Sequence, residues 1–301
     1  MNKKKILVTG CGGMLGEAVF NYFKDKADVF PTDIDLNEKW LTYLDVREYD
    51  SIKKAILEIK PDYVFHLAAF TDLEYSEKHP NEAYLTNVIG TENIALLCRE
   101  FNITMVYIST AGVVDGKKEF YTEYDDPNPL NIYGKTKYIG EKIVEKNLIK
   151  YFIFRAGWMM GGGEKKDKKF INKIIKQIKE GKKELFVVDD KLGTPTYTYN
   201  FVENIEVVIN SPFYGLYHMV SEGGGSRLEV AKEILKILNV KDVNIIKVDS
   251  NYFKKEYFAP RPTSEQLTNF KLSLRGLNKA RDWHINLRNY LLKYFKNYVK
   301  E

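Results

Sequence analysis

The chain has 301 residues, of which 44% are hydrophobic and 29% charged, and its formal net charge is +5. This composition is typical of a globular protein and excludes long disorder, collagen-like repeats and a coiled coil as the main architecture. No apolar run approaches the roughly 20 residues that span a bilayer, and the glycines after Val8 interrupt the first apolar stretch too early for a signal segment. We therefore expect a cytoplasmic protein with no membrane partner.

The cysteines, histidines and lysines give little evidence of a metal or a nucleic-acid partner. Cys11 and Cys98 form no CxxC pair, and the four histidines lack the spacing of a zinc site. A lysine-rich stretch over residues 165–183 has no interleaved aromatic side chains that could stack on bases. We interpret this stretch as the solvated face of a helix, and we expect neither a bound metal nor a nucleic acid.

The first half of the chain alternates short apolar segments with segments of helical periodicity. The expected strands are Ile6–Thr9, Asp28–Thr32, Tyr63–Leu67, Thr104–Ser109 and Tyr151–Ala156, and the expected helices are Met14–Phe23, Tyr49–Ile59, Asn81–Phe101 and Tyr133–Lys146. Nearly continuous apolar strands suit a parallel sheet that is buried on both faces. The alternation predicts an α/β fold with a Rossmann-type, doubly wound parallel sheet.

The pattern changes after residue 156. A glycine linker at residues 161–163 precedes shorter elements, which we expect at Lys168–Glu180, Leu185–Val188, Asn200–Ile209, Gly215–Met219, Arg227–Leu238, Val243–Val248 and Ile285–Val299. We expect residues 1–158 to form a dinucleotide-binding Rossmann domain, completed by parts of 185–220. Residues 159–301 are expected to form mainly a smaller, discontinuous substrate-binding lobe.

A glycine-rich turn follows the first expected strand. Its glycines, Gly10, Gly13 and Gly16, have the spacing G-x-x-G-x-x-G, because Leu15 occupies the third position of the strict G-x-G-x-x-G fingerprint. Such a turn lets backbone N–H groups and a helix N-terminus approach a pyrophosphate, and its last glycine permits close packing of helix on sheet. An ordinary glycine-rich turn is the alternative interpretation.

Asp33 favours the nucleotide interpretation. It ends the second expected strand, 17 residues after Gly16, where an acidic side chain can bind the adenosine ribose. A carboxylate at this position repels a 2′-phosphate, and the next residues, Ile34 and Asp35, include no arginine to receive one. We therefore expect NADH as the preferred cofactor and NADPH as the second choice.

A Tyr-x-x-x-Lys pair supplies candidate chemistry. Tyr133 and Lys137 share one face of a helix, so the lysine could lower the phenol pKa from its usual value of about 10 and allow proton transfer to a carbonyl. Ser109 and Thr110 end a strand whose carboxyl end would face the cofactor. The remaining matches lack such a partner, and we interpret them as surface pairs: Tyr22/Lys26, Tyr49/Lys53 and Tyr138/Lys142.

Several motifs together resemble the extended short-chain dehydrogenase/reductases, and among them the dTDP-4-dehydrorhamnose reductase family. The segments that carry the resemblance are Thr9–Gly16, His66–Thr71, Ile108–Thr110, Val114–Gly116, Asn131–Lys137, Arg155–Trp158, Gly193–Thr196 and Arg261–Pro262. The pairing of Gly-Thr-Pro-Thr with a late Arg-Pro is the most specific of these features. The resemblance covers nearly the whole chain and is compatible with a homodimer.

The resemblance implies a role for individual residues. Those implied in cofactor binding are Gly10, Gly13, Met14, Leu15, Gly16, Asp33, Asp45, Val46, Ala68, Ala69, Tyr133 and Lys137. Those implied in catalysis are Thr110, Tyr133 and Lys137, and those implied in binding the substrate are Thr71, Thr110, Trp158 and Arg261. Asn131 is the expected cap of the catalytic helix.

The implied reaction is NAD(P)H-dependent reduction of a 4-keto-6-deoxy nucleotide sugar, first of all dTDP-4-dehydrorhamnose to dTDP-rhamnose, for cell-surface polysaccharide precursors. Two departures leave the sugar open. Ala111-Gly112 replace an Asp-Tyr that the family usually has beside the sugar, and Glu265 stands where a serine is usual. The alternatives are a nucleotide-sugar epimerase with the same catalytic residues and a non-catalytic regulatory protein that binds a nicotinamide nucleotide.

Overall fold

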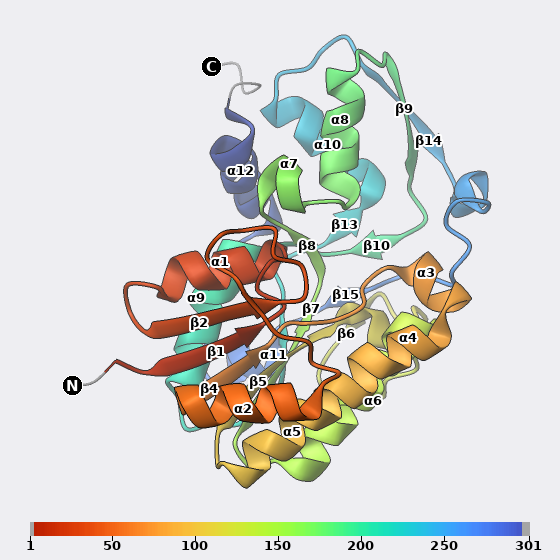
Figure 1. Cartoon of the computed structure of the whole chain (residues 1–301). Helices are drawn as coiled ribbons and strands as arrows, with labels where there is room; N and C mark the ends of the chain where they lie inside the picture. Colours follow the sequence, from red (N-terminus) through yellow and green to blue (C-terminus); the bar gives the residue numbers. More distant parts are fainter. Residues whose placement is uncertain (1–2, 297–301) are drawn as a thin grey trace.

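A computed structural model describes residues 3–296 and contains, within that range, a seven-stranded parallel sheet (Figure 1). The strand order is β12-β7-β5-β4-β1-β2-β3. The strands are β1 (Lys5–Thr9), β2 (Asp28–Asp33), β3 (Thr42–Tyr43), β4 (Tyr63–His66), β5 (Thr104–Thr110), β7 (Tyr151–Ala156) and β12 (Gly215–Met219). The order reverses between β1 and β4, which confirms the expected doubly wound Rossmann-type fold.

Helices cover both faces of this sheet, as Figure 1 shows. One face carries α1 (Met14–Phe23) and α9 (Thr198–Ile209), and the other carries α2 (Tyr49–Ile59), α5 (Gly90–Glu100) and α6 (Ile132–Asn147). Alternate residues of β1 point into the two apolar cores on either side of the sheet. Ile6 and Val8 pack with α1 and α9, whereas Leu7 packs with α2 and α5. This double burial explains the nearly continuous apolar sequence of the strands.

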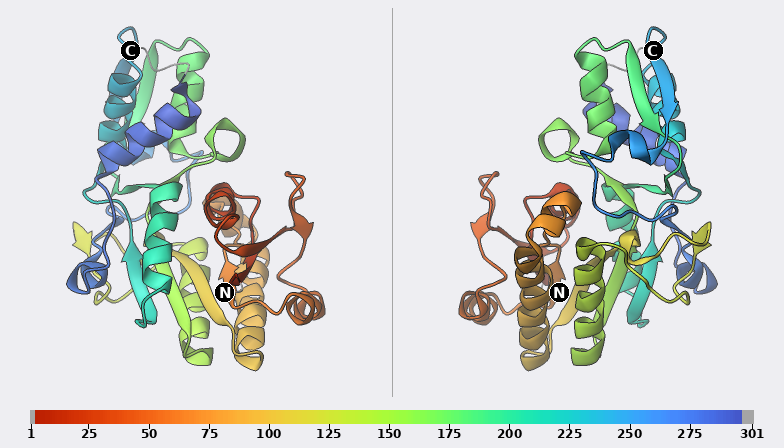
Figure 2. Two further views of the ribbon diagram at one scale, coloured as in Figure 1. Left: turned by 90° about the vertical axis from the view of Figure 1, so that its left-hand side faces the viewer. Right: turned by 90° about the vertical axis from the view of Figure 1, so that its right-hand side faces the viewer.

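The second lobe has a separate apolar core and stands above the carboxyl ends of the strands (Figure 2). Its main elements are α7 (Gly163–Lys166), α8 (Phe170–Lys179), β9 (Glu184–Val188), α10 (Arg227–Ile237), β14 (Asn244–Val248) and α12 (Trp283–Tyr294). The amphipathic α8 faces the core with its isoleucines, among them Ile171, Ile174 and Ile175.

Short elements connect the two parts. The short strands are β6 (Phe120–Tyr121), β8 (Trp158–Met160), β10 (Leu192–Gly193), β11 (Pro195–Tyr197), β13 (Gly225–Ser226) and β15 (Gln266–Leu267). The short helices are α3 (Leu73–Lys78), α4 (Pro80–Tyr84), α11 (Phe270–Leu274) and the 3₁₀ turns Ala111–Val113 and Ser250–Phe253. No helix within residues 3–296 is long and apolar enough to cross a membrane.

The structure corrects three expected boundaries. The single helix expected over residues 81–101 is divided by a π-helical segment, Leu85–Ile89, between α4 and α5. The expected glycine linker at 161–163 is buried and leads directly into α7, so it is not a loose connection. The closing helix ends at Tyr294, and its expected last residues, 297–299, lie outside the described part of the chain.

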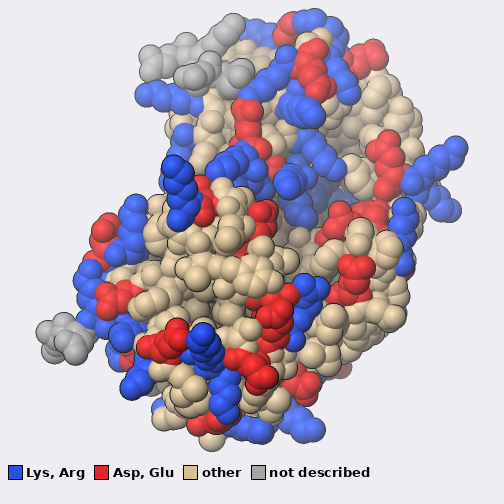
Figure 3. All heavy atoms as spheres, viewed as in Figure 1, with Lys and Arg blue, Asp and Glu red and all other residues tan. Residues whose placement is uncertain are grey.

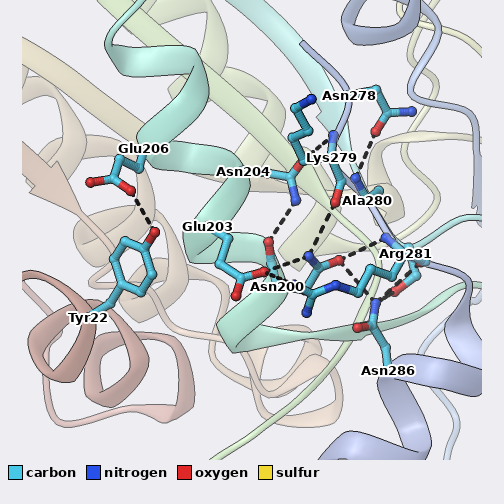
Figure 4. A network of polar contacts seen from close by, with 11 residues as sticks. Tyr22, Asn200, Glu203, Asn204, Glu206, Asn278, Lys279, Ala280, Arg281 and Asn286 are labelled. Carbon is cyan, nitrogen blue, oxygen red and sulfur yellow. Dashed lines mark hydrogen bonds and ion pairs between the residues drawn. The ribbon is translucent and has the colours of Figure 1, made fainter.

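A polar network fastens α9 to the segment that precedes α12 (Figure 4). The side-chain oxygen of Asn200 accepts hydrogen bonds from the Arg281 backbone N–H at 3.0 Å and from the side-chain amide of Asn286, a residue of α12, at 3.2 Å. On the same helix, Glu206 accepts a hydrogen bond from the Tyr22 hydroxyl of α1 at 2.6 Å. Helix α9 therefore bonds to both parts of the molecule.

A buried ion pair joins α6 to the sheet. The Arg155 guanidinium of β7 lies 2.7 Å from the Glu141 carboxylate of α6, and the two side chains are 4% and 0% exposed. Ser109 of β5 donates a hydrogen bond to the same carboxylate at 2.5 Å. Because Glu141 lies one helical turn after Lys137, this pair fixes the helix that carries the candidate catalytic residues.

We expect Arg155→Met to lower the free energy of unfolding by about 3–5 kcal/mol, because it leaves the Glu141 carboxylate buried without its partner. The measurement is urea denaturation followed by circular dichroism. Lys142→Met is the control: its ion pair with Glu145 has an ammonium side chain that is 55% exposed, and its loss should cost less than about 1 kcal/mol. Equal midpoints for the two variants would contradict the assigned role of the buried pair.

Candidate active site

A cavity of about 1420 Å³ opens between the carboxyl ends of the strands and the second lobe. It is lined by every residue that the sequence analysis assigned to the site: Gly10, Gly13, Met14, Leu15, Gly16, Asp33, Asp45, Val46, Ala68, Ala69, Thr71, Thr110, Tyr133, Lys137, Trp158 and Arg261. Figure 3 shows the hollow between the two parts, with lysine and arginine side chains gathered above it.

The glycine turn has the geometry of a phosphate-binding turn. Gly10 has a φ of +71°, and a Cβ on it would lie 2.4 Å from the backbone nitrogen of Ala68. A Cβ on Gly16 would lie 2.3 Å from the carbonyl oxygen of Cys11, whereas a Cβ on Gly13 would make only an ordinary contact, at 3.7 Å from the carbonyl oxygen of Gly10. No side chain caps the N-terminus of α1, so its first N–H groups can bind an anion. These features fit the pyrophosphate of a dinucleotide.

The carboxylate of Asp33 is held at this turn. It accepts hydrogen bonds from the backbone N–H of Gly12 at 2.8 Å and of Asp35 at 3.0 Å. Two bonds to rigid backbone fix its position at the end of β2. A ribose bound along the turn would therefore meet a preorganised hydrogen-bond acceptor.

Asp45 has a partner that the sequence analysis missed. The Arg47 guanidinium lies 2.5 Å from the Asp45 carboxylate and holds the pKa of that buried carboxyl below its usual value. Arg47 also lines the cavity, so an arginine does lie near the adenosine end, although not at the positions after Asp33. Its charge is balanced by Asp45.

The solvated-face interpretation of the lysine-rich stretch is wrong for Lys166. Its side chain is only 5% exposed, and its ammonium donates to the carbonyl oxygen of Gly12 at 2.9 Å and lies 3.2 Å from the Glu38 carboxylate. Lys165 is exposed as expected and pairs with the same carboxylate at 2.6 Å. Helix α7 thus brings the second lobe into contact with the glycine turn.

The candidate catalytic residues lie at the end of β5 and the start of α6. Asn131 caps α6 as expected, because its side chain accepts a hydrogen bond from the backbone N–H of Gly134 at 2.7 Å. The Thr110 hydroxyl oxygen accepts a hydrogen bond from the backbone N–H of Gly112 at 3.0 Å, while the Ser109 hydroxyl donates to the buried Glu141. Thr110 is therefore the hydroxyl of this strand that remains for a substrate.

The electrostatics of the pair differ from the expectation that Lys137 lowers the phenol pKa. Burial raises the pKa of Tyr133 to about 12, its hydrogen bond with Thr110 acts against this rise, and the negative charge of Glu265 adds to it. Burial lowers the pKa of Lys137 to about 7, against the attraction of Glu141. The ammonium lies 4.0 Å from the ring centre of Tyr107.

The other Tyr-x-x-x-Lys matches behave as the surface pairs that we expected. Lys26 lies 3.8 Å from the ring centre of Tyr22, and Lys142 lies 5.3 Å from that of Tyr138. Lys53 pairs with Glu100 instead of acting on Tyr49. None of these three pairs is among the described residues that line the cavity.

Trp158 is held in the cavity wall by two residues. A Cβ on Gly193 would lie 2.1 Å from the indole ring, so only glycine allows this approach. The indole N–H donates to the Glu265 carboxylate at 2.8 Å. The other carboxylate oxygen of Glu265 lies 3.4 Å from the position of a Cβ on Gly112. The two departures from the family pattern are therefore in contact with each other.

Two further residues of the site were not found from the sequence. Asn87, in the π-helical segment, binds the backbone N–H of Phe70 at 2.7 Å and the hydroxyl of Thr136 at 3.0 Å, and so holds the loop after β4 against α6. Arg227, the first residue of α10, stacks 3.6 Å from the ring centre of Trp158. Neither a π-helical turn nor a single arginine has a sequence pattern from which its function could be predicted.

Within the described range, no group of three or more His, Cys, Asp or Glu side chains is placed to hold a metal ion. Both cysteines are buried, and burial raises the pKa of each thiol. The chemistry available in the cavity is therefore that of a hydroxyl, a phenol, an ammonium and a dinucleotide-binding turn.

This fold and this set of residues define an extended short-chain dehydrogenase/reductase, a nicotinamide-dependent oxidoreductase. The chain belongs to the family described as the RmlD substrate binding domain, whose model matches residues 4–295. The resemblance inferred from the sequence is thereby confirmed.

Individual relatives agree with this assignment. The chain is 32% identical over 288 residues to the spore coat polysaccharide biosynthesis protein SpsK of Bacillus subtilis (strain 168). This alignment covers 95% of this chain and 96% of SpsK. It is 26% identical over 294 residues to methionine adenosyltransferase 2 subunit beta of Xenopus laevis, covering 96% and 87%. The crystal structure of dTDP-4-dehydrorhamnose reductase from Bacillus anthracis in complex with NADP has a TM-score of 0.89 at 32% identity, covering 97% and 100%.

The lowered pKa of Lys137 predicts a pH dependence. The ammonium is charged below a pH of about 7 and neutral above it, so activity that needs this cation should fall as the pH rises through about 7. We expect kcat/KM for the reduced cofactor, which reports the free enzyme, to show this descending limb. Lys137→Arg, whose guanidinium stays charged, should be slower but lack the limb. The same limb in the variant would exclude Lys137 as its origin.

Proposed function

We propose that this protein catalyses NAD(P)H-dependent reduction of a 4-keto-6-deoxy nucleotide sugar, with dTDP-4-dehydrorhamnose as the first candidate and dTDP-rhamnose as its product. The observation that carries the proposal is that Thr110 and Tyr133 lie in the same cavity as the glycine turn, and that this cavity continues past Trp158 into the second lobe. Such a cavity has room for a dinucleotide and a sugar nucleotide together. The names of SpsK and of the Bacillus anthracis reductase support a role in polysaccharide precursor synthesis.

In this proposal each of the three residues has one task. Thr110 donates a hydrogen bond to the ketone oxygen and orients it. Tyr133 passes its proton to that oxygen as the oxygen becomes a hydroxyl. Lys137, one turn further along α6, is proposed to bind the nicotinamide ribose of the cofactor. A reduced nicotinamide, when bound, supplies the hydride that the ketone carbon accepts.

The cofactor is proposed to bind along the glycine turn, with its ribose hydroxyls on Asp33 and its adenine beside Asp45 and Val46. The carboxylate of Asp33 favours NADH because it would repel a 2′-phosphate. NADPH remains the second choice, since Arg47 and Lys166 lie near this end and the Bacillus anthracis relative was crystallised with NADP.

The two parts of the molecule are proposed to bind different ligands. We infer that residues 1–158, with α9 and β12, bind the cofactor and that most of residues 159–301 bind the substrate. The position of β12 in the large sheet and the separate core of the second lobe support this division. Thr71, Trp158 and Arg261 are the proposed substrate contacts, and Glu265 adds an acceptor for a sugar hydroxyl or amino group.

A reductase assay tests the proposal directly. We expect stoichiometric loss of the absorbance of reduced nicotinamide when dTDP-4-dehydrorhamnose or a related 4-keto sugar nucleotide is added. An epimerase would convert a sugar nucleotide without net oxidation of the cofactor. A regulatory protein, such as the name of the Xenopus laevis relative suggests for that protein, would bind the cofactor without turnover.

Tyr133→Phe is expected to reduce kcat by about 10²–10⁴-fold while cofactor affinity stays nearly unchanged, because the positioned proton donor is lost. Steady-state kinetics and titration of the cofactor by fluorescence measure the two effects. The controls are the tyrosines of the surface pairs, Tyr22→Phe, Tyr49→Phe and Tyr138→Phe, which should keep turnover within a few-fold. Full activity of Tyr133→Phe would contradict the mechanism.

Asp33→Ala is expected to weaken NADH binding and to reduce the preference for NADH over NADPH. Loss of the carboxylate removes hydrogen bonds to the ribose and the repulsion of a 2′-phosphate, so the two dissociation constants should approach each other. Calorimetry with both cofactors measures them. Equal dissociation constants in the unmodified protein would overturn the proposed preference.

A further inference from the structure

One carboxylate oxygen of Glu265 has no hydrogen-bond partner in the cavity wall. The first oxygen, Oε2, accepts the indole N–H of Trp158 at 2.8 Å. Among the described residues no donor bonds the second oxygen, Oε1, although the side chain is half-buried and lines the cavity. A carboxylate has about four acceptor sites, so this oxygen can accept a hydrogen bond from a ligand.

The carboxylate is fixed in position by the backbone around it. The backbone N–H of Glu265 donates to the carbonyl oxygen of Leu192 at 2.9 Å, and the chain passes directly into β15, which pairs with β6. On the other side, the Ser264 hydroxyl donates to the carbonyl oxygen of Glu119 at 2.5 Å. Because the side chain is also bonded to Trp158, the acceptor is ordered before a ligand binds, and this order lowers the entropic cost of binding.

The free oxygen lies across Gly112 from the candidate catalytic hydroxyl. Oε1 of Glu265 and Oγ1 of Thr110 are each 3.4 Å from the point where a Cβ on Gly112 would stand, so the two oxygens are at most twice that distance apart. Burial raises the pKa of Tyr133 to about 12 and the charge of Glu265 adds to this rise, so the carboxylate also lies within electrostatic reach of the phenol. A ketone held by Thr110 and Tyr133 would therefore have this carboxylate beside it.

A neighbouring cation indicates which kind of donor fits the free oxygen. The Arg227 guanidinium stacks 3.6 Å from the ring centre of Trp158, the same indole that bonds to Glu265. Burial lowers the pKa of Arg227 to about 10, and the charge of Glu265 acts against this decrease, so each charge partly balances the other. The carboxylate therefore needs no cation from a ligand, and a neutral hydroxyl group suits it.

We propose that Glu265 determines which sugar the protein accepts, because it accepts a hydrogen bond from a hydroxyl group on the carbon next to the ketone. This inference rests on the proposed reduction of a 4-keto-6-deoxy sugar, in which the hydroxyl beside the ketone is the one on carbon 3. A sugar without that hydroxyl would enclose a carboxylate oxygen that has no partner. A site of this kind discriminates strongly against the incomplete ligand.

The test measures the binding of dTDP-rhamnose and of its 3-deoxy analogue by calorimetry in the presence of NADH, where no hydride transfer occurs because sugar and cofactor are both reduced. We expect the full chain to bind dTDP-rhamnose about 10- to 100-fold more tightly than the analogue. Glu265→Ala should abolish this ratio, and Glu265→Gln, which keeps an acceptor but not the charge, should retain a smaller ratio. Glu58→Ala, at an exposed position of α2, is the matched control and should retain the full ratio.

Two results would overturn the inference. One is that the unmodified protein binds both ligands equally well or binds neither. The other is a full ratio in Glu265→Ala, with or without weaker binding of both ligands, which a purely structural role beside Trp158 would give. Unchanged NADH affinity in the variant shows that the fold is intact. A ratio that depends on Glu265, without oxidation of NADH by a keto sugar, would refute the proposed reaction alone. Reduction of the keto sugar with a ratio that does not depend on Glu265 would refute this inference alone.

Discussion

The backbone after β4 passes so close to the end of β1 that the residue directly after β1 has no room for a side chain. A Cβ on Gly10 would lie within 2.5 Å of two backbone atoms of Ala68. This contact lies where the strand order reverses, and there the crevice of a doubly wound sheet opens. The uncapped N-terminus of α1 follows β1, while Asp33 ends β2 and Thr110 ends β5, the strands on either side of β1 and β4 in the sheet.

The second lobe is joined to this crevice by contacts of two kinds. Helix α9 packs on α1 in the first core and also bonds to the segment before α12, so it provides a permanent connection. Lys166 of α7 reaches the carbonyl oxygen of Gly12, directly at the glycine turn. A cofactor bound at the turn would therefore lie next to residues of both parts. The same cavity continues from the turn into the second lobe.

Much of the fold was predictable because its signals are local. The bounds of α1, α2, β7 and β12 agree with the expected ones to the residue, and Asn131 caps α6 as its sequence context suggested. The missed residues depend on contacts between distant parts of the chain. Lys166 is 154 residues from the carbonyl that it binds, and Lys165 beside it is exposed. Periodicity cannot separate such a residue from its neighbours, and it likewise gave no reason to single out Arg227.

The two departures from the family pattern lie together beside Thr110. Gly112 leaves space beside Thr110, and the carboxylate of Glu265 enters that space while it accepts the indole N–H of Trp158. The family's usual Asp-Tyr at residues 111–112 is thus matched by an acidic side chain from a loop about 150 residues later. Thr110, Tyr133 and Lys137 keep the residue types of the family motif, so under the proposed function the departures would act on recognition of the sugar and not on transfer of the proton. Burial raises the pKa of Tyr133, and the negative charge of Glu265 adds to that rise, so Glu265 acts on the phenol as well as on the indole N–H of Trp158.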